Sequence, residues 1–372
     1  MTQTPMMTLP KRLESIQALR GVAALLVLFF HLAAFQSEMA AGNSVGLGVL
    51  SSIWENGWVG VDLFFIISGF IMVYVTRQTG RSFGDVKRFL VSRVTRIYPL
   101  WWVCAGIMAF YFWITYGMPA APDRVSGPSE AFAYAAKSFF LIPQSSEPIL
   151  GLGWTLIHEM FFYIVFAGLL FLPRKYLIWA LLVWALFTLV GSQFVTPSSF
   201  GRNIPELLTS PLSLEFIAGG LAGYLVSKTK IYASTLIFFS GIFATIIALF
   251  IFPTLTDINY TISRVSIFMM PFVLLTYGWV GCELRGDFIT PKWLSRLGDW
   301  SYSLYLTHYI VLISLRRVYR WVVPEGFRSD ALGLWDNLIF AILAVAMSIF
   351  TASVFYNFIE RPSLNFFKKR RA

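Results

Sequence analysis

Charged side chains are scarce in this sequence. Asp, Glu, Lys and Arg together make up 13% of its 372 residues, whereas hydrophobic residues make up 57%. A soluble domain of this length could not hide so much apolar surface, so the composition excludes a soluble protein. The chain is therefore expected to lie in a lipid bilayer.

Cysteine is also scarce. The two cysteines, Cys104 and Cys282, fall within apolar stretches and have no metal-ligand spacing. This pattern excludes a disulfide framework, so we interpret both as packing residues and expect no metal site. A polar stretch long enough to form a soluble domain is missing, as are internal repeats and heptads. We therefore expect a single integral-membrane domain, residues 1–372.

Apolar stretches of about 18–22 residues recur along the chain, and each could cross a hydrocarbon core of roughly 30 Å. They predict an all-α, polytopic membrane protein with about ten transmembrane helices. The predicted helices lie near residues 17–36, 58–76, 97–117, 152–172, 176–195, 207–227, 231–252, 262–282, 298–315 and 336–358.

The basic residues of the loops predict how this bundle is oriented. Lys and Arg gather in alternate loops, most densely in the connection 77–96, and this asymmetry predicts that both termini are cytoplasmic. The net charge of +10 is then mainly an orientation signal and a match to anionic membrane lipids, with no basic stripe to suggest nucleic acid. Arg316, Arg317 and Arg320 follow the ninth helix on the opposite side, and this topology does not explain them.

The longest connection on the outer side, 118–149, carries five prolines with aromatic residues between them. Long loops of this kind are usually functional, so we expect an ordered cap over the outer mouth of the bundle.

Arg20 and His31 are the first candidate functional residues. They are eleven positions apart within one apolar stretch. At about 100° per residue this spacing returns to within roughly 20° of the same direction, about 16 Å along one helix. A fixed cation and a titratable base on one face of a membrane helix indicate a functional site. An Arg at a helix end can also simply reach the lipid headgroups, but a His deep in an apolar stretch cannot.

The predicted topology places three further groups by depth. His31, Asp62 and Glu159 are expected in the outer half of the bilayer, where Glu159 could orient His31 and stabilise its charge as a general base. The cytoplasmic end is expected to hold only cations, so Arg20, Arg93 and Arg96 could bind phosphates there. This polarity fits coenzyme A, whose long arm would deliver a thioester to His31. Simpler interpretations are that Arg93 and Arg96 only orient the chain and that Asp62 only stabilises a helix start.

Two further segments carry polar side chains at helical spacing. Trp154 opens a segment in which Thr155, Glu159 and Tyr163 share one face, whereas His158 points about 100° away. Ser301, Tyr305 and His308 line one face of the ninth helix. These three residues could border a substrate groove or form hydrogen bonds between helices, and the sequence does not separate the two interpretations.

Five short motifs together resemble the acyltransferase 3 family of bacterial integral-membrane acyltransferases, which O-acylate exopolysaccharides, O-antigens and nodulation factors. The resemblance covers nearly the whole chain. It is carried by Leu19–Ala24 with His31, by Val59–Phe70, by Arg93–Pro99, by Trp154–Tyr163 and by Gly298–His308, and Glu360–Pro362 matches the usual end of the last helix.

The resemblance implies an acyl-coenzyme A donor, usually acetyl, and a carbohydrate hydroxyl as acceptor, on a lipid-linked or polymeric glycan. It also implies that Arg20 and His31 are the essential pair and that Arg93 and Arg96 contact the coenzyme. The expected location is the bacterial cytoplasmic (inner) membrane. Some members carry a fused extracytoplasmic hydrolase-like domain, which we do not expect here.

We therefore predict a membrane O-acetyltransferase with His31 and Glu159 as catalytic residues and Arg20, Arg93 and Arg96 as donor-binding residues. Candidate substrate-binding residues are Asp62, Trp154, Tyr163, Ser301, Tyr305 and His308. Either His31 deprotonates the acceptor hydroxyl for direct attack or it is transiently acetylated, and we favour direct attack. A secondary transporter or flippase for an acylated or anionic solute is the alternative, because buried Arg, His and Glu also form proton relays. A succinyl donor and a non-sugar acceptor stay open, and nothing in the sequence specifies an oligomeric state.

Overall fold

The computed structural model describes residues 10, 12–39, 54–195, 201–228, 233–251, 262–322 and 334–369. Within these ranges the chain forms helices and no strand. Six helical spans of the described chain are long and apolar enough to cross a membrane: Glu14–Ser37, Glu55–Val75, Phe83–Tyr116, Arg174–Gly191, Arg264–Arg285 and Leu338–Lys368. The prediction of an all-α, polytopic membrane protein is therefore confirmed.

Each of the ten apolar segments predicted from the sequence coincides with a helix. These helices are α1 (Glu14–Met39), α3 (Val59–Val75), α4 (Phe83–Tyr116), α6 (Gly153–Leu169), α7 (Leu177–Gly191), α9 (Leu212–Lys228), α10 (Ser234–Ile251), α11 (Ile262–Arg285), α13 (Ser301–Val322) and α14 (Leu334–Phe355). Ten crossings and cytoplasmic termini stay predictions.

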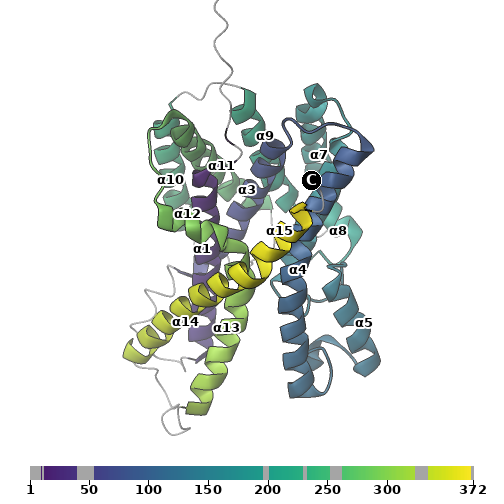
Figure 1. Ribbon diagram of the computed structural model, residues 1–372, viewed down its shortest axis with the longest axis vertical. Helices are drawn as coiled ribbons and strands as arrows, with labels where there is room; N and C mark the ends of the chain where they lie inside the picture. The colour runs from purple at the N-terminus through teal and green to yellow at the C-terminus, as the bar shows by residue number, and fades with distance from the viewer. Residues whose placement is uncertain are drawn as a thin grey trace, which may run out of the picture.

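Shorter elements connect these helices. They are η1 (Glu55–Trp58), η2 (Pro122–Arg124), α5 (Pro128–Phe139), η3 (Arg174–Tyr176), α8 (Ile204–Leu208), α12 (Lys292–Asp299), the π-helical segment η5 (Tyr356–Glu360) and α15 (Arg361–Lys369). In Figure 1 the continuous run from α14 through η5 to α15 crosses the bundle diagonally and ends beside α4.

Two helices are longer than predicted. α4 begins at Phe83 and not near residue 97, because Ser82 and Asp85 form a capping box at its start. Much of the basic connection 77–96 is therefore helical. α13 continues to Val322, so that Arg316 and Arg317 lie within the helix and not in the loop after it. In both cases the extension is polar, so a search for apolar stretches of membrane length did not include it.

Glycines let α3 and α9 pack with their backbones in contact. A Cβ atom on Gly219 of α9 would lie 1.9 Å from the carbonyl oxygen of Ile66, and one on Gly69 of α3 would lie 1.8 Å from that of Phe216. Small residues allow this close approach between membrane helices, where van der Waals packing replaces the hydrophobic effect as the driving force. Any larger residue at either position would force the two helices apart.

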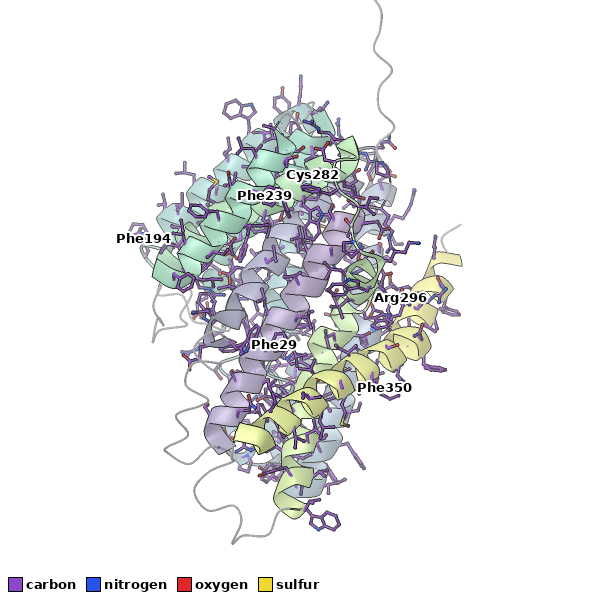
Figure 2. The ribbon with its side chains drawn as sticks, turned by 90° about the vertical axis from the view of Figure 1, so that its left-hand side faces the viewer. Phe29, Phe194, Phe239, Cys282, Arg296 and Phe350 are labelled. Atoms are coloured by element: carbon purple, nitrogen blue, oxygen red, sulfur yellow. The ribbon has the colours of Figure 1, made fainter. Side chains whose placement is uncertain are left out.

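Large apolar side chains cover much of the outer surface of the bundle. Phe194, Phe239 and Phe350 are 83%, 53% and 70% exposed (Figure 2). A soluble monomer rarely exposes so many large apolar side chains, whereas lipid chains can cover them in a membrane.

Cys104 and Cys282 are both buried, and neither forms a disulfide, which confirms their assignment as packing residues.

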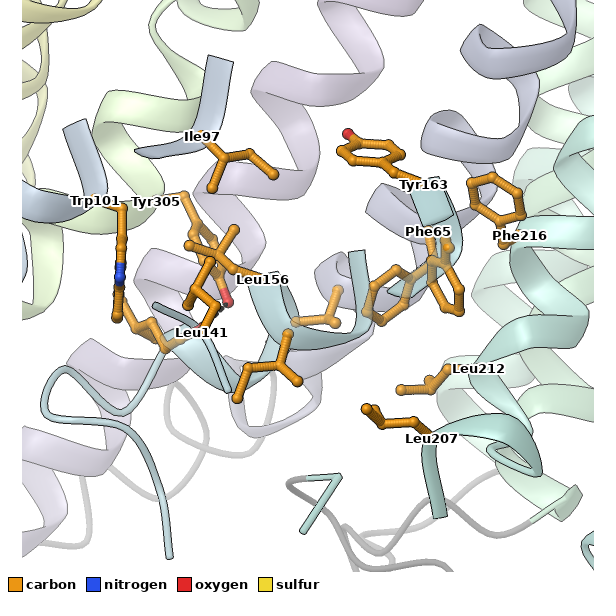
Figure 3. Packing of buried hydrophobic residues seen from close by; sticks show 14 of the residues in the cluster. Phe65, Ile97, Trp101, Leu141, Leu156, Tyr163, Leu207, Leu212, Phe216 and Tyr305 are labelled. Carbon is orange, nitrogen blue, oxygen red and sulfur yellow. Dashed lines mark hydrogen bonds between the residues drawn. The ribbon is translucent and has the colours of Figure 1, made fainter. Parts of the chain in front are cut away.

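The interior contains a core of aromatic and aliphatic side chains. Figure 3 shows Phe65, Phe216 and Tyr163 gathered on one side of this core and Trp101 and Tyr305 on the other. These residues come from α3, α4, α6, α9 and α13, so the core joins the helices that carry most of the candidate functional residues.

The connection 118–149 is ordered, as predicted, and that it covers the outer side of the bundle stays a prediction. Its helix α5 is fixed to α4, because the indole Nε1 atoms of Trp101 and Trp102 each donate to the carbonyl oxygen of Phe139, at 3.2 and 3.1 Å. Arg124 of η2 donates to Glu147 at 2.9 Å and ties the two ends of the cap together. Figure 1 shows α5 beside the end of α4 that is far from α12 and α15.

Candidate functional site

A cavity of about 320 Å³ opens among α1, α3, α4, α6 and α13, and we name it the arginine cavity. Its lining includes four arginines, Arg12, Arg20, Arg93 and Arg96, and one carboxylate, that of Glu159. Arginines stay charged at any physiological pH, so the cavity is electropositive. Its size lies within the range of small-molecule sites.

Arg93 and Arg96 reach this cavity from one face of α4, where their spacing of three residues makes them neighbours. The Arg93 guanidinium lies 5.4 Å from the ring centroid of Phe89 and 5.8 Å from that of Tyr163. Its Nε atom is buried and has no hydrogen-bond partner. A buried donor without an acceptor is costly, so this atom is suited to bind an anionic ligand.

Arg20 enters the same cavity from α1, where its Nη1 atom donates to the Oε1 atom of Gln17 at 3.1 Å. It lies close enough to Arg96 for the two cations to repel each other, and Glu159 and Glu360 offset that repulsion. At the mouth of the cavity, Arg12 pairs with Glu14 and Asp299, at 2.8 and 3.2 Å. Arg20, Arg93 and Arg96, the three predicted phosphate ligands, therefore lie together.

Glu159 lies among these cations and does not orient His31. Its Oε1 atom accepts from the Ser68 hydroxyl at 3.2 Å and from the Tyr163 hydroxyl at a shorter distance. It also interacts electrostatically with Arg20 and Arg93. The predicted pairing of Glu159 with His31 is therefore wrong in this structure, as is the prediction that the end of the bundle near Arg20 holds only cations.

The packing of α6 explains this error. The prediction placed its start at the membrane surface, but α6 begins at Gly153 inside the protein, directly after Leu150 and Leu152, which are 0% and 5% exposed. A Cβ atom on Gly153 would lie 2.4 Å from the ring of Trp101. Two turns further on, Glu159 reaches Ser68 of α3 and lies near Arg93 of α4, so its partners follow from the packing of α6 and not from a count of turns.

Glu360 lies near the cations of the arginine cavity without lining it, and it was not among the predicted functional residues. It ends the π-helical segment η5, is 3% exposed and accepts from the Ser303 hydroxyl at 2.6 Å. It interacts electrostatically with Arg96 and Arg20. π-Helical turns inserted in helices frequently mark functional sites. The resemblance of Glu360–Pro362 to a family motif was the only signal for it in the sequence.

His31 is paired with His308. The Nδ1 atom of His31 lies 2.9 Å from the carbonyl oxygen of Val27 and 3.3 Å from the Nε2 atom of His308. The Nδ1 atom of His308 lies 3.0 Å from the carbonyl oxygen of Leu304. Of the two interpretations of His308, the structure favours hydrogen bonding between helices.

These contacts assign the tautomers of both rings. A carbonyl oxygen only accepts, so the Nδ1 atom of each histidine carries the proton that it shares with its carbonyl. The Nε2 atom of His308 is then the acceptor for the Nδ1 proton of His31. The Nε2 atom of His31 keeps its lone pair, as a general base requires.

A second cavity of about 590 Å³ lies under the cap, and we name it the cap cavity. Its lining comes from the later parts of α1, α4 and α13, whereas the arginine cavity is lined by their earlier parts. These three helices therefore run in the same direction from one cavity to the other.

The histidine pair lies between the two cavities. Tyr305 lines the arginine cavity and its ring centroid is 6.2 Å from that of His308, whereas Tyr309 lines the cap cavity and is 5.4 Å from His31. Figure 1 shows α13 running from beside α12, near the middle of the bundle, to the lower end of the bundle. Neither histidine lines a cavity itself, so each cavity meets the pair through one tyrosine.

Asp62 is part of a separate buried cluster. Its carboxylate accepts from the Nε and Nη2 atoms of Arg264, at 3.0 and 2.6 Å, and Glu215 interacts electrostatically with both residues. All three side chains are at most 2% exposed. Asp62 lines neither cavity, and its expected depth in the membrane and its role in substrate binding stay predictions.

The other predicted residues divide between the cavity wall and the packed interior. Tyr163 and Tyr305 line the arginine cavity, where the Tyr305 hydroxyl lies 2.8 Å from the Thr155 hydroxyl. Trp154 lines neither cavity and contacts His158, at 5.9 Å between ring centroids. The Ser301 hydroxyl is buried without a hydrogen-bond partner.

Within the described part of the chain no group of three or more His, Cys, Asp or Glu could hold a metal ion.

Comparison with known proteins identifies relatives along nearly the whole chain. The family model described as an acyltransferase domain, that of the acyltransferase 3 family, matches residues 13–357. The chain is 30% identical over 332 residues to the exopolysaccharide production protein ExoZ of Rhizobium meliloti, covering 85% of this chain and 92% of ExoZ.

Two further relatives are named as transferases. Acyltransferase MdmB of Streptomyces mycarofaciens is 26% identical, with 97% of this chain and 94% of MdmB covered. O-acetyltransferase OatA of Staphylococcus aureus is 23% identical, with 95% of this chain and 57% of OatA covered. No solved structure matches the chain.

Proposed function

Since this chain belongs to the acyltransferase 3 family, we propose that it transfers an acetyl group from acetyl-coenzyme A to a hydroxyl of a surface or exported carbohydrate. It is a membrane O-acyltransferase, and the donor and acceptor are the proposed part. The observation that carries the proposal is the histidine pair between an arginine-lined cavity and a second cavity under the cap.

The arginine cavity supports a donor that carries phosphates. Arg20, Arg93 and Arg96 would bind the phosphates of coenzyme A, because guanidinium groups bind phosphate through two parallel hydrogen bonds. The acyl end of the donor would extend toward Tyr305, beyond which the histidine pair lies. We propose that the arginine cavity faces the cytoplasm of a bacterium, where acetyl-coenzyme A is made, and that the protein lies in the inner membrane.

His31 would act as the general base. Its Nε2 atom takes the proton of the acceptor hydroxyl while the hydroxyl oxygen forms a bond to the carbonyl carbon of the thioester. The carbon–sulfur bond then breaks, and the proton passes from His31 to the departing thiolate. Glu159 would keep Tyr163 and the arginines in place, so its proposed role changes from a partner of His31 to a positioning residue.

The cap cavity supports a carbohydrate acceptor that enters from the other end of the bundle. Its lining is rich in aromatic rings, which bind the apolar faces of sugars. ExoZ is named for exopolysaccharide production and OatA for O-acetyl transfer. These names support a lipid-linked or polymeric glycan as the acceptor.

Coenzyme A release by the purified protein in nanodiscs, with membrane glycolipids as acceptor, tests this proposal. We expect His31→Ala to lower the acceptor-dependent rate by about 10²- to 10⁴-fold, the usual contribution of a general base. Arg93→Gln/Arg96→Gln should raise the KM for acetyl-coenzyme A by about 100-fold or more, because at least two charge-assisted hydrogen bonds of about 1.5–3 kcal/mol each are lost.

Acetyl-pantetheine, which lacks the phosphates, gives the matched comparison. Its KM should be the same for the wild type and for Arg93→Gln/Arg96→Gln. Arg88→Gln is the control variant, since Arg88 lies on α4 with its side chain 67% exposed and outside the cavity. Equal losses with both donors, or full activity of His31→Ala, would contradict the proposal.

A separate measurement distinguishes the two reaction routes. If the protein carries a bound acetyl group in the absence of acceptor, and His31→Ala does not, the reaction proceeds through an acetyl-histidine intermediate and not by direct attack.

A further inference from the structure

One end of the arginine cavity is apolar. The cavity follows α3 from Val75 to Val61, which is about 21 Å at 1.5 Å per residue. Arg12 lies at the Val75 end, because the carbonyl oxygen of Pro10 accepts from the Tyr74 hydroxyl at 2.8 Å. The opposite end, which we name the apolar end, is lined by Val61, Phe64, Phe65, Thr155, Leu156 and Tyr305. None of these six side chains is charged.

The apolar end lies between the arginines and the histidine pair. Thr155 precedes Glu159, which interacts with the arginines, by about one turn of α6. The Tyr305 hydroxyl lies 2.8 Å from that of Thr155, and the Tyr305 ring centroid is 6.2 Å from that of His308. A group that extends from the arginines toward the histidine pair therefore enters the apolar end.

Phe64 closes this end with its ring. Its ring centroid lies 5.8 Å from that of Tyr305, and the two rings meet edge to face at an interplanar angle of 77°. Phe64 also packs against a cluster to which α1 contributes Leu28 and α13 contributes Leu304. A ring packed among three helices cannot move aside without disturbing its neighbours. Phe64 and Tyr305 thus limit how far a bound group can extend.

The apolar end also offers no partner to a charged group. Among the described residues that line it, the polar side chains are those of Thr155 and Tyr305, whose hydroxyls contact each other. A carboxylate bound there would meet no cation, and Glu159, four residues after Thr155 on α6, carries a charge of the same sign. Burying an unpaired carboxylate is strongly unfavourable.

We infer that Phe64 sets the length of the acyl group that the protein transfers, so that the apolar end admits a short, uncharged group such as acetyl and excludes longer or charged ones. This inference rests on the proposed function and narrows its donor. One methylene in an apolar pocket changes kcat/KM by about 10- to 200-fold, so a single ring can decide between acyl groups. Phe64 is then a specificity-determining residue.

The test compares acetyl-, butyryl- and succinyl-coenzyme A as donors for coenzyme A release, with the full protein in nanodiscs and membrane glycolipids as acceptor. For the wild type, kcat/KM should be about 100-fold or more lower with butyryl and succinyl than with acetyl. Phe64→Ala should raise the ratio of butyryl to acetyl kcat/KM by about 10- to 100-fold, because it opens space for the longer chain, and Phe64→Leu should raise it less. Succinyl has the same four carbons but ends in a carboxylate, so it should stay a poor donor in both variants.

Leu63→Ala is the control, since Leu63 is the neighbour of Phe64 on α3, is 1% exposed and lines neither cavity. It should lower Tm and leave the ratio of butyryl to acetyl unchanged. Leu156→Ala enlarges the apolar end from α6 and should act as Phe64→Ala does, so it carries the test where Phe64→Ala does not fold.

Three results would each overturn the inference. The first is a wild type that uses butyryl as well as acetyl. The second is a ratio that the Phe64 and Leu156 variants leave unchanged, or that Leu63→Ala raises equally. The third is a gain for succinyl in Phe64→Ala as large as the gain for butyryl.

A binding measurement separates this inference from the proposed function. S-Ethyl- and S-butyl-coenzyme A carry chains of two and four carbons on a thioether, which cannot be transferred. At equal concentration S-ethyl-coenzyme A should raise the Tm of the wild type more than S-butyl-coenzyme A does, and Phe64→Ala should remove the difference. Such selective binding, without coenzyme A release from acetyl-coenzyme A, would contradict the proposed function and leave the role of Phe64 supported. Release that is indifferent to chain length would do the reverse.

Discussion

At the scale of single residues, the ring of His31 is fixed through its Nδ1 atom. That atom lies within reach of both the Val27 carbonyl oxygen and the Nε2 atom of His308. A base that is fixed in this way presents Nε2 in one direction, and catalysis depends on such orientation. His308 is therefore proposed as a positioning residue that acts through His31.

Replacing His308 tests this role. We expect His308→Leu to lower kcat for acetyl transfer by about tenfold, because His31 would keep one of its two acceptors and sample other orientations. The KM for acetyl-coenzyme A should not change. His308→Gln should restore part of kcat, since its amide oxygen can accept the Nδ1 proton.

Steady-state kinetics with both substrates varied would measure these constants. A merely structural role for His308 predicts a different result, in which Leu and Gln variants lose activity in proportion to their loss of folded protein. Equal kcat values for the two variants at equal Tm would therefore contradict the positioning role.

At the scale of elements, α3 is fixed by two kinds of contact. Gly69 and Gly219 bring its backbone against that of α9, and the buried pair of Asp62 with Arg264 joins it to α11. α3 also carries Ser68, which donates to Glu159 in the arginine cavity. The close packing of α3 thus positions one wall of the candidate donor site.

Enlarging a glycine at the contact between α3 and α9 should destabilise the protein. We expect Gly219→Val to lower the free energy of unfolding by about 1–3 kcal/mol or more, because its Cβ atom would collide with the Ile66 backbone. Gly106→Ala in α4 is the control: a Cβ atom there meets nothing within 4 Å, and alanine favours a helix by about 0.5–1 kcal/mol. Thermal unfolding in detergent, followed by Tm, would measure both, and an unchanged Tm for Gly219→Val would exclude the close contact.

At the scale of the whole molecule, the two cavities divide the bundle along its length. α1, α4 and α13 each pass from the arginine cavity to the cap cavity. Loops on the side of the arginine cavity also contact one another, since Arg174 donates to the Thr76 carbonyl oxygen at 3.5 Å and to the Ser227 hydroxyl at 3.2 Å. Loops predicted to share one side of the membrane are thus adjacent.

Labelling of single cysteines tests which side is cytoplasmic. Thr79, in the turn after α3, and Lys137, on α5, are both exposed, whereas the native Cys104 and Cys282 are buried. We expect a membrane-impermeant maleimide to label Lys137→Cys in intact spheroplasts and Thr79→Cys only in inverted vesicles, because basic loops stay in the cytoplasm. The opposite pattern would reverse the proposed sidedness of the donor and acceptor.

The sequence by itself determined the class of the protein, the places of its long helices and three cations of the arginine cavity. Hydrophobicity summed over a membrane length is a local property, so each predicted apolar segment coincides with a helix. The spacing of Arg93 and Arg96 on one helix is local as well, and both line the arginine cavity together with Arg20 of α1.

The tertiary structure alone decided which charged and titratable groups meet. Glu159 contacts Ser68 and Tyr163, whereas His31 contacts His308, which is 277 residues further along the chain. These pairings depend on where each helix begins within the protein, as the buried start of α6 shows, and on how helices rotate against their neighbours. Neither quantity is encoded in the periodicity of a single segment, because both arise from packing between segments that are distant in the chain.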